Sequence, residues 1–391
     1  MEGRIAIVGG GPAGMMAAIR AAGILGGGER VVLFDKNDRL GRKIYLTGKG
    51  RCNLTNLRPW EEFATHLHPN QGFLKQAFRA FSNEDAIRFF ESIGVPVVTL
   101  QGQRVYPASL VAGDVARALE RRVRESGVEI RYRTRIASMS DLSGFDAVIL
   151  ATGGKSYPVT GSTGDGYALA QEAGHTVTPL FPSETALLPQ PYDPGLPGLE
   201  LKNVGLHLFI DRTPVESDQG DFNFTEDGLE SGIAYHLSRR AVWALCNGQK
   251  VEIVLDLKPA LTLEKLSARI VRDSITVRKD SLRSMMPEAL IDPFLRANPG
   301  ITAAGLPARL KEWRFRIVDY KGYERAVVTA GGVNLKEIVP KTMASRLRPG
   351  LYFCGELLDL DGDTGGYNLQ IAFSTGALAG ASAARYLLSL R

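Results

Sequence analysis

The chain has 391 residues, of which 44% are hydrophobic and 23% charged, and its formal net charge is +5. These values are those of an ordinary folded protein and exclude a disordered chain, a collagen-like repeat and a disulfide scaffold. Glycine is in excess, because its 43 residues make up about 11% of the chain against an ordinary share of ~7%.

The first half of the chain alternates between predicted strands and predicted helices. The elements expected there, from apolar runs and helical spacing, are strand 5–8, helix 12–24, strand 31–34, a helix between Ser82 and Gly94, helix 113–126, and strands 129–136 and 147–150. The basic stretch from Arg104 to Arg135 is interrupted by acidic residues and is interpreted as a solvated helix face. Nucleic acid is therefore not expected as a partner.

A proline-rich segment after Pro179 marks a crossover out of the first domain. The patterns beyond it predict strands within 199–257, helices within 262–311, strands at 327–328 and 351–353, and a helix over 371–388.

Cysteines, histidines and apolar runs exclude several other classes of protein. Cys52, Cys246 and Cys354 lie far apart, so no disulfide framework or zinc ribbon is expected. His66 and His68 are interpreted as a solvated loop pair, and no metal is expected. No apolar stretch approaches the ~18 residues of a membrane span, and the N-terminus does not resemble a signal peptide. We expect a cytoplasmic protein that does not contact the membrane.

The glycine loop at the N-terminus predicts a dinucleotide site. Gly9-x-Gly11-x-x-Gly14 follows a strand and opens a helix, and Asp35 ends the next strand. The glycines let the backbone approach a pyrophosphate at the helix N-terminus, and the acid accepts hydrogen bonds from ribose hydroxyls. Asp35 favours FAD or NAD over a nucleotide that carries a 2′-phosphate.

Two later glycine segments indicate FAD as the dinucleotide. Gly355 and Glu356 follow an apolar strand and precede the C-terminal helix, as in flavoproteins of the two-dinucleotide-binding class. Residues 151–154, Ala-Thr-Gly-Gly, form the middle signature of that class. The N-terminus of the C-terminal helix is expected at the pyrimidine edge of the flavin, where negative charge appears on reduction.

Long motifs resemble the bacterial BaiN-like (YhiN-type) flavoproteins, which are usually labelled NAD(P)/FAD-dependent oxidoreductases. They lie at 40–56, at 161–166, and from 329 through 340–343 to 363–368. The resemblance implies an α/β fold with a Rossmann-like FAD domain, an inserted β-rich domain and a nested helical domain. We expect the FAD domain over 1–184 and 345–391, the β-rich domain over 185–258 and 312–344, and the helical domain over 259–311.

The cofactor site is predicted from these motifs. Lys49 and Arg51 are expected to contact flavin or substrate. The residues assigned to FAD are Gly9, Gly11, Pro12, Ala13, Gly14, Asp35, Lys36, Arg42, Lys43, Thr47, Gly48, Gly50, Arg51, Cys52, Asn53, Ala151, Thr152, Gly153, Gly154, Gly355, Glu356, Asp361, Asp363, Gly365, Gly366, Tyr367, Asn368 and Leu369.

The catalytic groups are not assigned by these patterns. Cys52 and Tyr157 are weak candidates, a thiolate stabilised by Arg51 and a proton donor respectively, and packing is preferred for both. Asp165 is expected to cap the helix that follows it.

The predicted activity is hydride transfer between the flavin and a small organic substrate. NADH or NADPH as a transient reductant is left open, because no second glycine loop follows a strand. The alternatives are an oxygen-using oxidase of small amines and an RNA-associated flavoprotein. The oligomeric state is open.

Overall fold

The computed structural model describes residues 3–390 and divides the chain into two compact units. The first unit comprises residues up to Phe181 and from Val327 onward, and the second comprises Pro182–Ala326. Residues 327–344, which the sequence analysis assigned to the β-rich domain, lie in the first unit. The further division of the second unit into a β-rich and a helical domain stays a prediction.

The core of the first unit is a seven-stranded sheet in the order β17-β18-β19-β8-β1-β2-β7. Its strands are β17 (Ile338–Val339), β18 (Ala344–Ser345), β19 (Leu351–Phe353), β8 (Ala147–Leu150), β1 (Ile5–Val8), β2 (Val31–Phe34) and β7 (Glu129–Arg131). The five strands from β19 to β7 are parallel, whereas β17 and β18 pair antiparallel at one edge. The predicted Rossmann-type α/β fold is confirmed.

Two predicted boundaries differ from the structure. The strand expected over 129–136 ends at Arg131, because Arg133 has a left-handed backbone with φ of 50° that a strand cannot continue. The C-terminal helix begins at Tyr367 rather than at 371, since Gly366 with φ of 101° ends the preceding loop directly before it.

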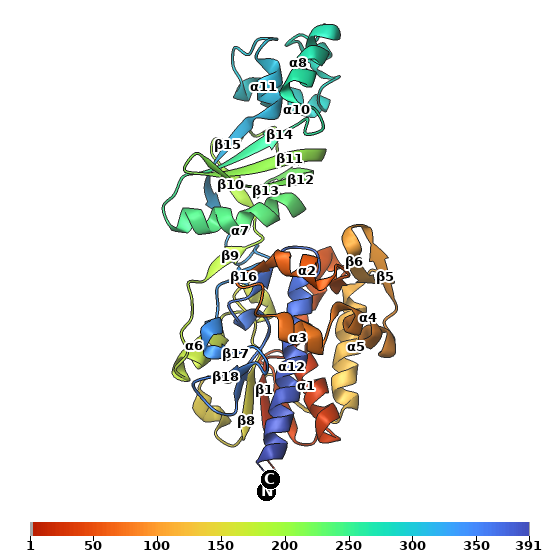
Figure 1. The fold of residues 1–391 in the computed structure, drawn as a ribbon, viewed down its shortest axis with the longest axis vertical. Coiled ribbons are helices and arrows are strands. Elements are labelled where there is room, and N and C mark those ends of the chain that lie inside the picture. Colours follow the sequence, from red (N-terminus) through yellow and green to blue (C-terminus); the bar gives the residue numbers. More distant parts are fainter. Residues whose placement is uncertain (1–2, 391) are drawn as a thin grey trace. The chain divides into compact units, whose positions relative to one another are not determined.

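Two helices from opposite ends of the chain lie side by side against this sheet, α1 (Pro12–Leu25) and α12 (Tyr367–Ser389) (Figure 1). The backbones of the two helices are in direct contact at two glycines of α12. A Cβ on Gly376 would lie 2.3 Å from the Ala13 carbonyl oxygen, and a Cβ on Gly380 would lie 2.2 Å from the Ala17 carbonyl oxygen. The small residues of both helices therefore allow a closer approach than larger side chains would. Within residues 3–390, no helix combines the length and apolarity needed to cross a membrane.

Smaller elements complete the first unit. They are η1 (Arg42–Gly50), β3 (Thr55–Asn56), α2 (Trp60–Phe63), η2 (Ala64–His66), β4 (Leu67–His68), α3 (Lys75–Ala80), α4 (Asn83–Ser92), β5 (Val97–Leu100), η3 (Gln101–Gln103), β6 (Arg104–Pro107), α5 (Ala112–Glu125), η4 (Met139–Leu142), η5 (Pro158–Thr160), α6 (Asp165–Glu172), β16 (Val328–Ala330), η6 (Leu335–Glu337), η7 (Gly355–Leu357) and β20 (Asp361–Gly362). Strands β3, β6 and β5 form a separate three-stranded sheet.

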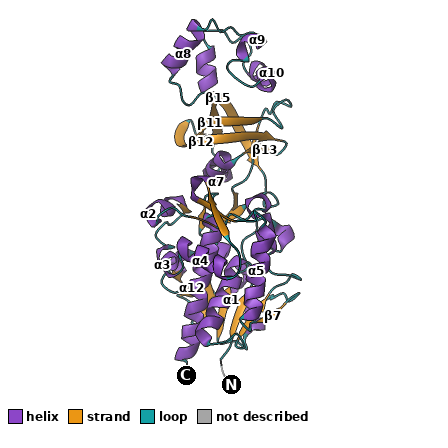
Figure 2. Ribbon diagram, turned by 90° about the vertical axis from the view of Figure 1, so that its right-hand side faces the viewer, coloured by secondary structure: helices purple, strands orange, loops and turns teal. Residues whose placement is uncertain are grey.

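The second unit is built around a closed barrel in the order β10-β13-β12-β11-β14-β15. These strands are β10 (Leu187–Pro189), β11 (Glu200–Ile210), β12 (Thr213–Thr225), β13 (Gly228–Glu230), β14 (Val251–Asp256) and β15 (Trp313–Tyr320), with helix α7 (Gly232–Cys246) after β13. Short helices lie together at one end of the barrel (Figure 2), namely α8 (Leu263–Arg272), α9 (Lys279–Leu282), α10 (Glu288–Ala297) and α11 (Leu306–Lys311).

We expect Gly380→Ala to lower the free energy of unfolding by about 1–3 kcal/mol, because the added methyl group overlaps the Ala17 carbonyl oxygen and pushes α1 and α12 apart. Gly23→Ala is the matched control, since a Cβ there meets nothing within 4 Å and a helix interior favours alanine. Chemical denaturation measures both, and equal stability of the two variants would contradict the close packing.

Candidate functional site

The glycine loop between β1 and α1 forms the floor of the candidate site. Gly9 has φ of 105°, and a Cβ there would lie 2.5 Å from the Ala151 carbonyl oxygen. A Cβ on Gly14 would lie 1.8 Å from the Gly9 carbonyl oxygen. A Cβ on Gly11, in contrast, would meet nothing within 4 Å, and no side chain caps the N-terminus of α1. The first N–H groups of α1 therefore face open space, as an anion site at a helix N-terminus requires.

Asp35, at the end of β2, holds this loop in place. Its Oδ2 accepts a 2.8 Å hydrogen bond from the Gly10 N–H, and its Oδ1 accepts bonds of 2.8 and 2.9 Å from the Asn37 N–H and side chain. Asn37 also donates to the Thr160 carbonyl oxygen over 3.1 Å. The aspartate predicted to bind ribose thus orders the loop with one oxygen and the start of the next segment with the other.

A pocket opens above the glycine loop and is lined wholly by residues of the first unit. It brings together the three glycine segments that the sequence places far apart. The predicted cofactor residues that line it are Gly9, Gly11, Pro12, Ala13, Asp35, Lys36, Arg42, Lys43, Thr47, Ala151, Thr152, Gly153, Gly355, Glu356, Asn368 and Leu369.

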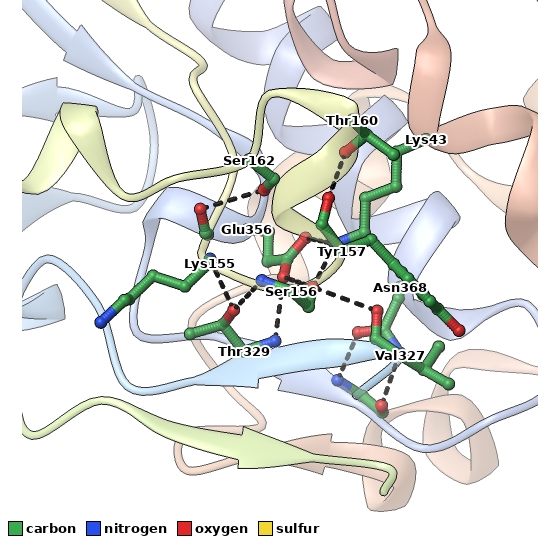
Figure 3. Close-up of polar contacts among 12 residues, drawn as sticks. Lys43, Lys155, Ser156, Tyr157, Thr160, Ser162, Val327, Thr329, Glu356 and Asn368 are labelled. Carbon is green, nitrogen blue, oxygen red and sulfur yellow. Dashed lines mark hydrogen bonds and ion pairs between the residues drawn. The ribbon is translucent and has the colours of Figure 1, made fainter. Parts of the chain in front are cut away.

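Glu356 is the centre of a polar network at the wall of this pocket (Figure 3). Its Oε2 accepts a 2.6 Å hydrogen bond from the Lys43 ammonium group in an ion pair. Its Oε1 accepts bonds from the Ser156 hydroxyl, at 2.8 Å, and from the Thr329 N–H, at 2.9 Å. The Thr329 hydroxyl in turn accepts from the backbone N–H groups of Lys155 and Ser156. One carboxylate therefore joins four segments of the chain.

The other predicted cations of the site also have partners. The Lys36 ammonium group bonds Thr163 at 2.6 Å and Asp165 at 2.8 Å. Arg42 donates to the Asn37 side-chain oxygen at 2.9 Å. Partial burial acts to raise the pKa of Asp165, but bonds from Lys36 and Thr163 outweigh it and lower that pKa.

The expected capping role of Asp165 is wrong. Gly164 is the N-cap of α6, and Asp165 is the first helical residue. Its carboxylate is occupied by Lys36 and by Arg135, whose Nε lies 3.2 Å away.

The remaining predicted cofactor residues do not line the pocket. Gly154 lies against the network instead, since a Cβ there would meet Thr329 and Glu356 within 3 Å. A Cβ on Gly366 would meet Thr55 and Asn53, so the loop before α12 rests directly on that segment. The others outside the lining are Gly14, Gly48, Gly50, Arg51, Cys52, Asn53, Asp361, Asp363, Gly365 and Tyr367.

Asp363 forms hydrogen bonds to both histidines of the 66–68 segment. Its oxygens lie 2.8 Å from His66 Nδ1 and 3.0 Å from His68 Nε2. His66 also stacks on Tyr367 with ring centroids 4.4 Å apart. The pair interpreted as solvated is therefore tied to the loop before α12. Among the described residues, no cluster of three histidine, cysteine or acidic side chains is arranged to hold a metal.

The two weak catalytic candidates differ in setting. Cys52 is fully buried, and this burial raises the pKa of its thiol to about 12, so the side chain is a neutral thiol at physiological pH. Its packing against the core favours the structural interpretation over a reactive thiolate. Tyr157 lies in the loop after Ser156, with a left-handed backbone of φ 52°, and does not line the pocket.

Sequence reasoning missed Ser156, Thr329 and Asn37. Ser156 is completely buried and Thr329 is 1% exposed, yet both contact the predicted Glu356. The only signal was their position beside glycine motifs, since Ser156 follows 151–154 and Thr329 opens Thr-Ala-Gly-Gly.

The residues present suit an FAD molecule. The open cradle at Gly11 accepts a pyrophosphate against free N–H groups. The buried Thr152 Oγ1 lies at the pocket, and no hydrogen-bond partner is found for it among the described residues. Gly366 is the N-cap of α12 and no side chain caps this helix, so its first N–H groups are free to face a ring that gains negative charge.

Comparison with known proteins finds relatives over nearly the whole chain. The profile of the HI0933-like protein Rossmann domain matches residues 3–382. A protein of Clostridium scindens named 3-dehydro-bile acid delta(4,6)-reductase is 31% identical over 97% of this chain and 99% of its own. Proteins of Escherichia coli and Haemophilus influenzae named ribosomal RNA dihydrouridine synthase are 29% and 28% identical, each over 94% of this chain and 95% of its own.

A solved structure shows the same fold at low identity. The 3-ketosteroid-delta4-(5alpha)-dehydrogenase of Rhodococcus jostii superposes with a TM-score of 0.50 at 15% identity, over 98% of this chain and 97% of its own. The family match and the reductase relative confirm the resemblance to BaiN-like flavoproteins and the prediction of an FAD-dependent oxidoreductase.

We expect Lys43→Met to lower the free energy of unfolding by about 1–3 kcal/mol, because it leaves the largely buried Glu356 carboxylate without its cation. We also expect the dissociation constant for FAD to rise about tenfold, a loss of about 1.4 kcal/mol. Lys341→Met is the control, since Lys341 is exposed and lies outside the pocket. Flavin fluorescence titration measures the affinity, and equal values for both variants would rule out the role of the ion pair.

We expect Cys52→Ala to keep the bound flavin and the reaction rate and to cost only about 1 kcal/mol of stability. Iodoacetamide at neutral pH should label the exposed Cys246 of the native protein and leave Cys52 and Cys354 unmodified, since burial raises the pKa of both. Mass spectrometry of the peptides reads the labelling, and rapid labelling of Cys52 with loss of activity would restore the thiolate hypothesis.

Proposed function

Because the chain belongs to the HI0933-like protein Rossmann domain family, we propose that it uses FAD to reduce a carbon–carbon double bond conjugated to a carbonyl group. The observation behind this proposal is a chemistry that two sets of relatives share. A delta(4,6) bond system beside a 3-dehydro (oxo) group, and the 5,6 double bond of uridine beside its carbonyl, are both conjugated double bonds. Each gains one hydride and one proton.

The preferred substrate is a small organic enone, since the reductase from Clostridium scindens matches nearly the full length of both chains. The relatives named for ribosomal RNA favour a second candidate, the uracil ring of an RNA uridine. Both substrates require reduction of a conjugated double bond, and they differ in the group attached to the reacting ring.

FAD, when bound, supplies hydride transfer. The protein contributes binding and orientation. The N–H groups at the start of α1 hold the pyrophosphate, and Asp35 keeps the loop that presents them in shape. Glu356, fixed by Lys43 and Ser156, offers its carboxylate to the ribityl hydroxyls. The α12 N-terminus would direct partial positive charge toward the ring that becomes anionic on reduction.

NADH or NADPH is the proposed reductant. The sequence has one Gly-x-Gly-x-x-Gly loop that follows a strand, and we assign this loop to FAD. The nicotinamide nucleotide would therefore enter transiently, deliver its hydride and leave before the substrate enters.

The test is anaerobic reduction of the FAD-loaded protein with NADH or NADPH, followed by an enone or by its saturated ketone as control. We expect the flavin absorbance to return with the enone and not with the saturated ketone, and mass spectrometry to show a product two hydrogens heavier. If the flavin absorbance returned only when oxygen is admitted, and if the protein formed peroxide from added amines, the proposal would be contradicted and the oxidase favoured.

A further inference from the structure

Three exposed cations of the first unit lie at the end of η1 and at the start of strand β6. Lys49 and Arg51 lie in the loop that closes η1, and Arg104 begins β6. The Arg51 guanidinium lies over the ring of Tyr106, with its carbon 5.3 Å from the ring centroid. Arg104 and Tyr106 are two residues apart on one strand, so their side chains point to the same face. Lys49, Arg51 and Arg104 are called the cationic surface below.

No acid neutralises this surface within residues 3–390. Arg51 donates to the Gly48 carbonyl oxygen over 3.3 Å, and Arg104 donates to that of Gln101 over 2.9 Å. Among the described residues, no ion pair joins any of the three cations to a carboxylate, whereas exposed arginines elsewhere, such as Arg88 and Arg283, are paired with acids. Cations without counter-charge attract an anionic ligand.

The backbone of the segment that carries Lys49 and Arg51 is in a conformation of raised energy. Gly48, Lys49, Gly50 and Cys52 all have left-handed φ angles, between 56° and 82°. Such a conformation costs about 1–3 kcal/mol at a residue other than glycine and is found where function requires it. Lys49 and Cys52 both bear this cost.

The cationic surface adjoins the candidate cofactor site. Thr47, two residues before Lys49, lines the pocket. The Asn56 side chain donates to the carbonyl oxygens of Gly102 and Gly365, each at 3.1 Å. The turn that precedes Arg104 is thereby tied to the loop that leads into α12.

The charge of the chain is divided unequally between the units. Residues 182–326 contain 19 lysines and arginines and 20 acidic residues, so their net charge is −1 and the rest of the chain carries +6. A polyanionic ligand is therefore attracted to the first unit rather than to the barrel and its short helices.

We propose that the cationic surface binds backbone phosphates of an RNA substrate beside the flavin. This inference rests on the second candidate of the proposed function. Arg51 lies over Tyr106 of the strand that Arg104 begins, and Lys49 is two residues before Arg51. Several cations match a repeating anion better than they match the single carboxylate of a small enone. Tyr106 is buried beneath Arg51 and supports its guanidinium, and the exposed planar guanidinium can stack on a base.

The experiment measures binding of the FAD-loaded protein to a short fluorescent RNA hairpin with a uridine-rich loop, at salt concentrations between about 50 and 200 mM. We expect the double variant Arg51→Gln and Arg104→Gln to bind about tenfold more weakly, and its slope of log affinity against log salt to fall by about 0.7 for each lost phosphate contact. The matched control is Arg88→Gln with Arg283→Gln, which removes two exposed arginines that are already paired. The bound flavin spectrum verifies that both proteins are folded.

Equal loss of affinity in the two double variants would overturn the proposal, as would a wild-type protein that does not bind the hairpin. Competition by a steroid carboxylate at the same surface, with no salt-dependent RNA binding, would assign it to a small enone and also overturn the proposal. The proposed function is judged separately by return of flavin absorbance with an enone, which requires no RNA. Failure of one is therefore distinct from failure of the other.

Discussion

The cofactor site depends on one contact, the packing of α1 against α12. These helices come from opposite ends of the sequence, and their glycines meet carbonyl oxygens at distances that exclude any side chain. The contact fixes the N-terminus of α12 relative to the glycine loop that opens α1. The two helix ends that we assign to the pyrophosphate and to the flavin ring are therefore placed by a single interface, with no need for any group of the barrel.

The Lys43–Glu356 ion pair joins two further segments beside the packed helices α1 and α12. The two residues are 313 positions apart in the chain, yet their charged atoms lie 2.6 Å apart. A partly buried carboxylate loses hydration and must be compensated by cations and donors. Lys43, Ser156 and the Thr329 N–H provide this compensation, so the acid stays oriented toward the pocket. Segments that are distant in the sequence can meet here because they follow parallel strands, whose carboxyl ends all lie at the same edge of the sheet.

Some of this arrangement was predictable from the sequence, and some was not. The glycine loop and Asp35 were predictable because their spacing is fixed by one βαβ unit, within which local geometry decides the contacts. The partnership of Ser156 with Thr329 and Glu356 was not, because Ser156 lies 173 and 200 residues before them in segments that carry no shared pattern. The end of β7 was missed because strand periodicity continues through Arg133, and only the backbone angle of that residue shows the turn.

The discontinuous first unit has a consequence for synthesis on the ribosome. Strands β1 and β2 emerge early, but β19 and α12 follow more than 300 residues later, a wait of roughly 15–60 s at ordinary elongation rates. The second unit is continuous in sequence and its barrel is closed, so it can fold during this interval. The glycine loop has no α12 to pack against until Tyr367–Ser389 have been synthesised. FAD is thus expected to be incorporated after that point rather than while the second unit is being synthesised.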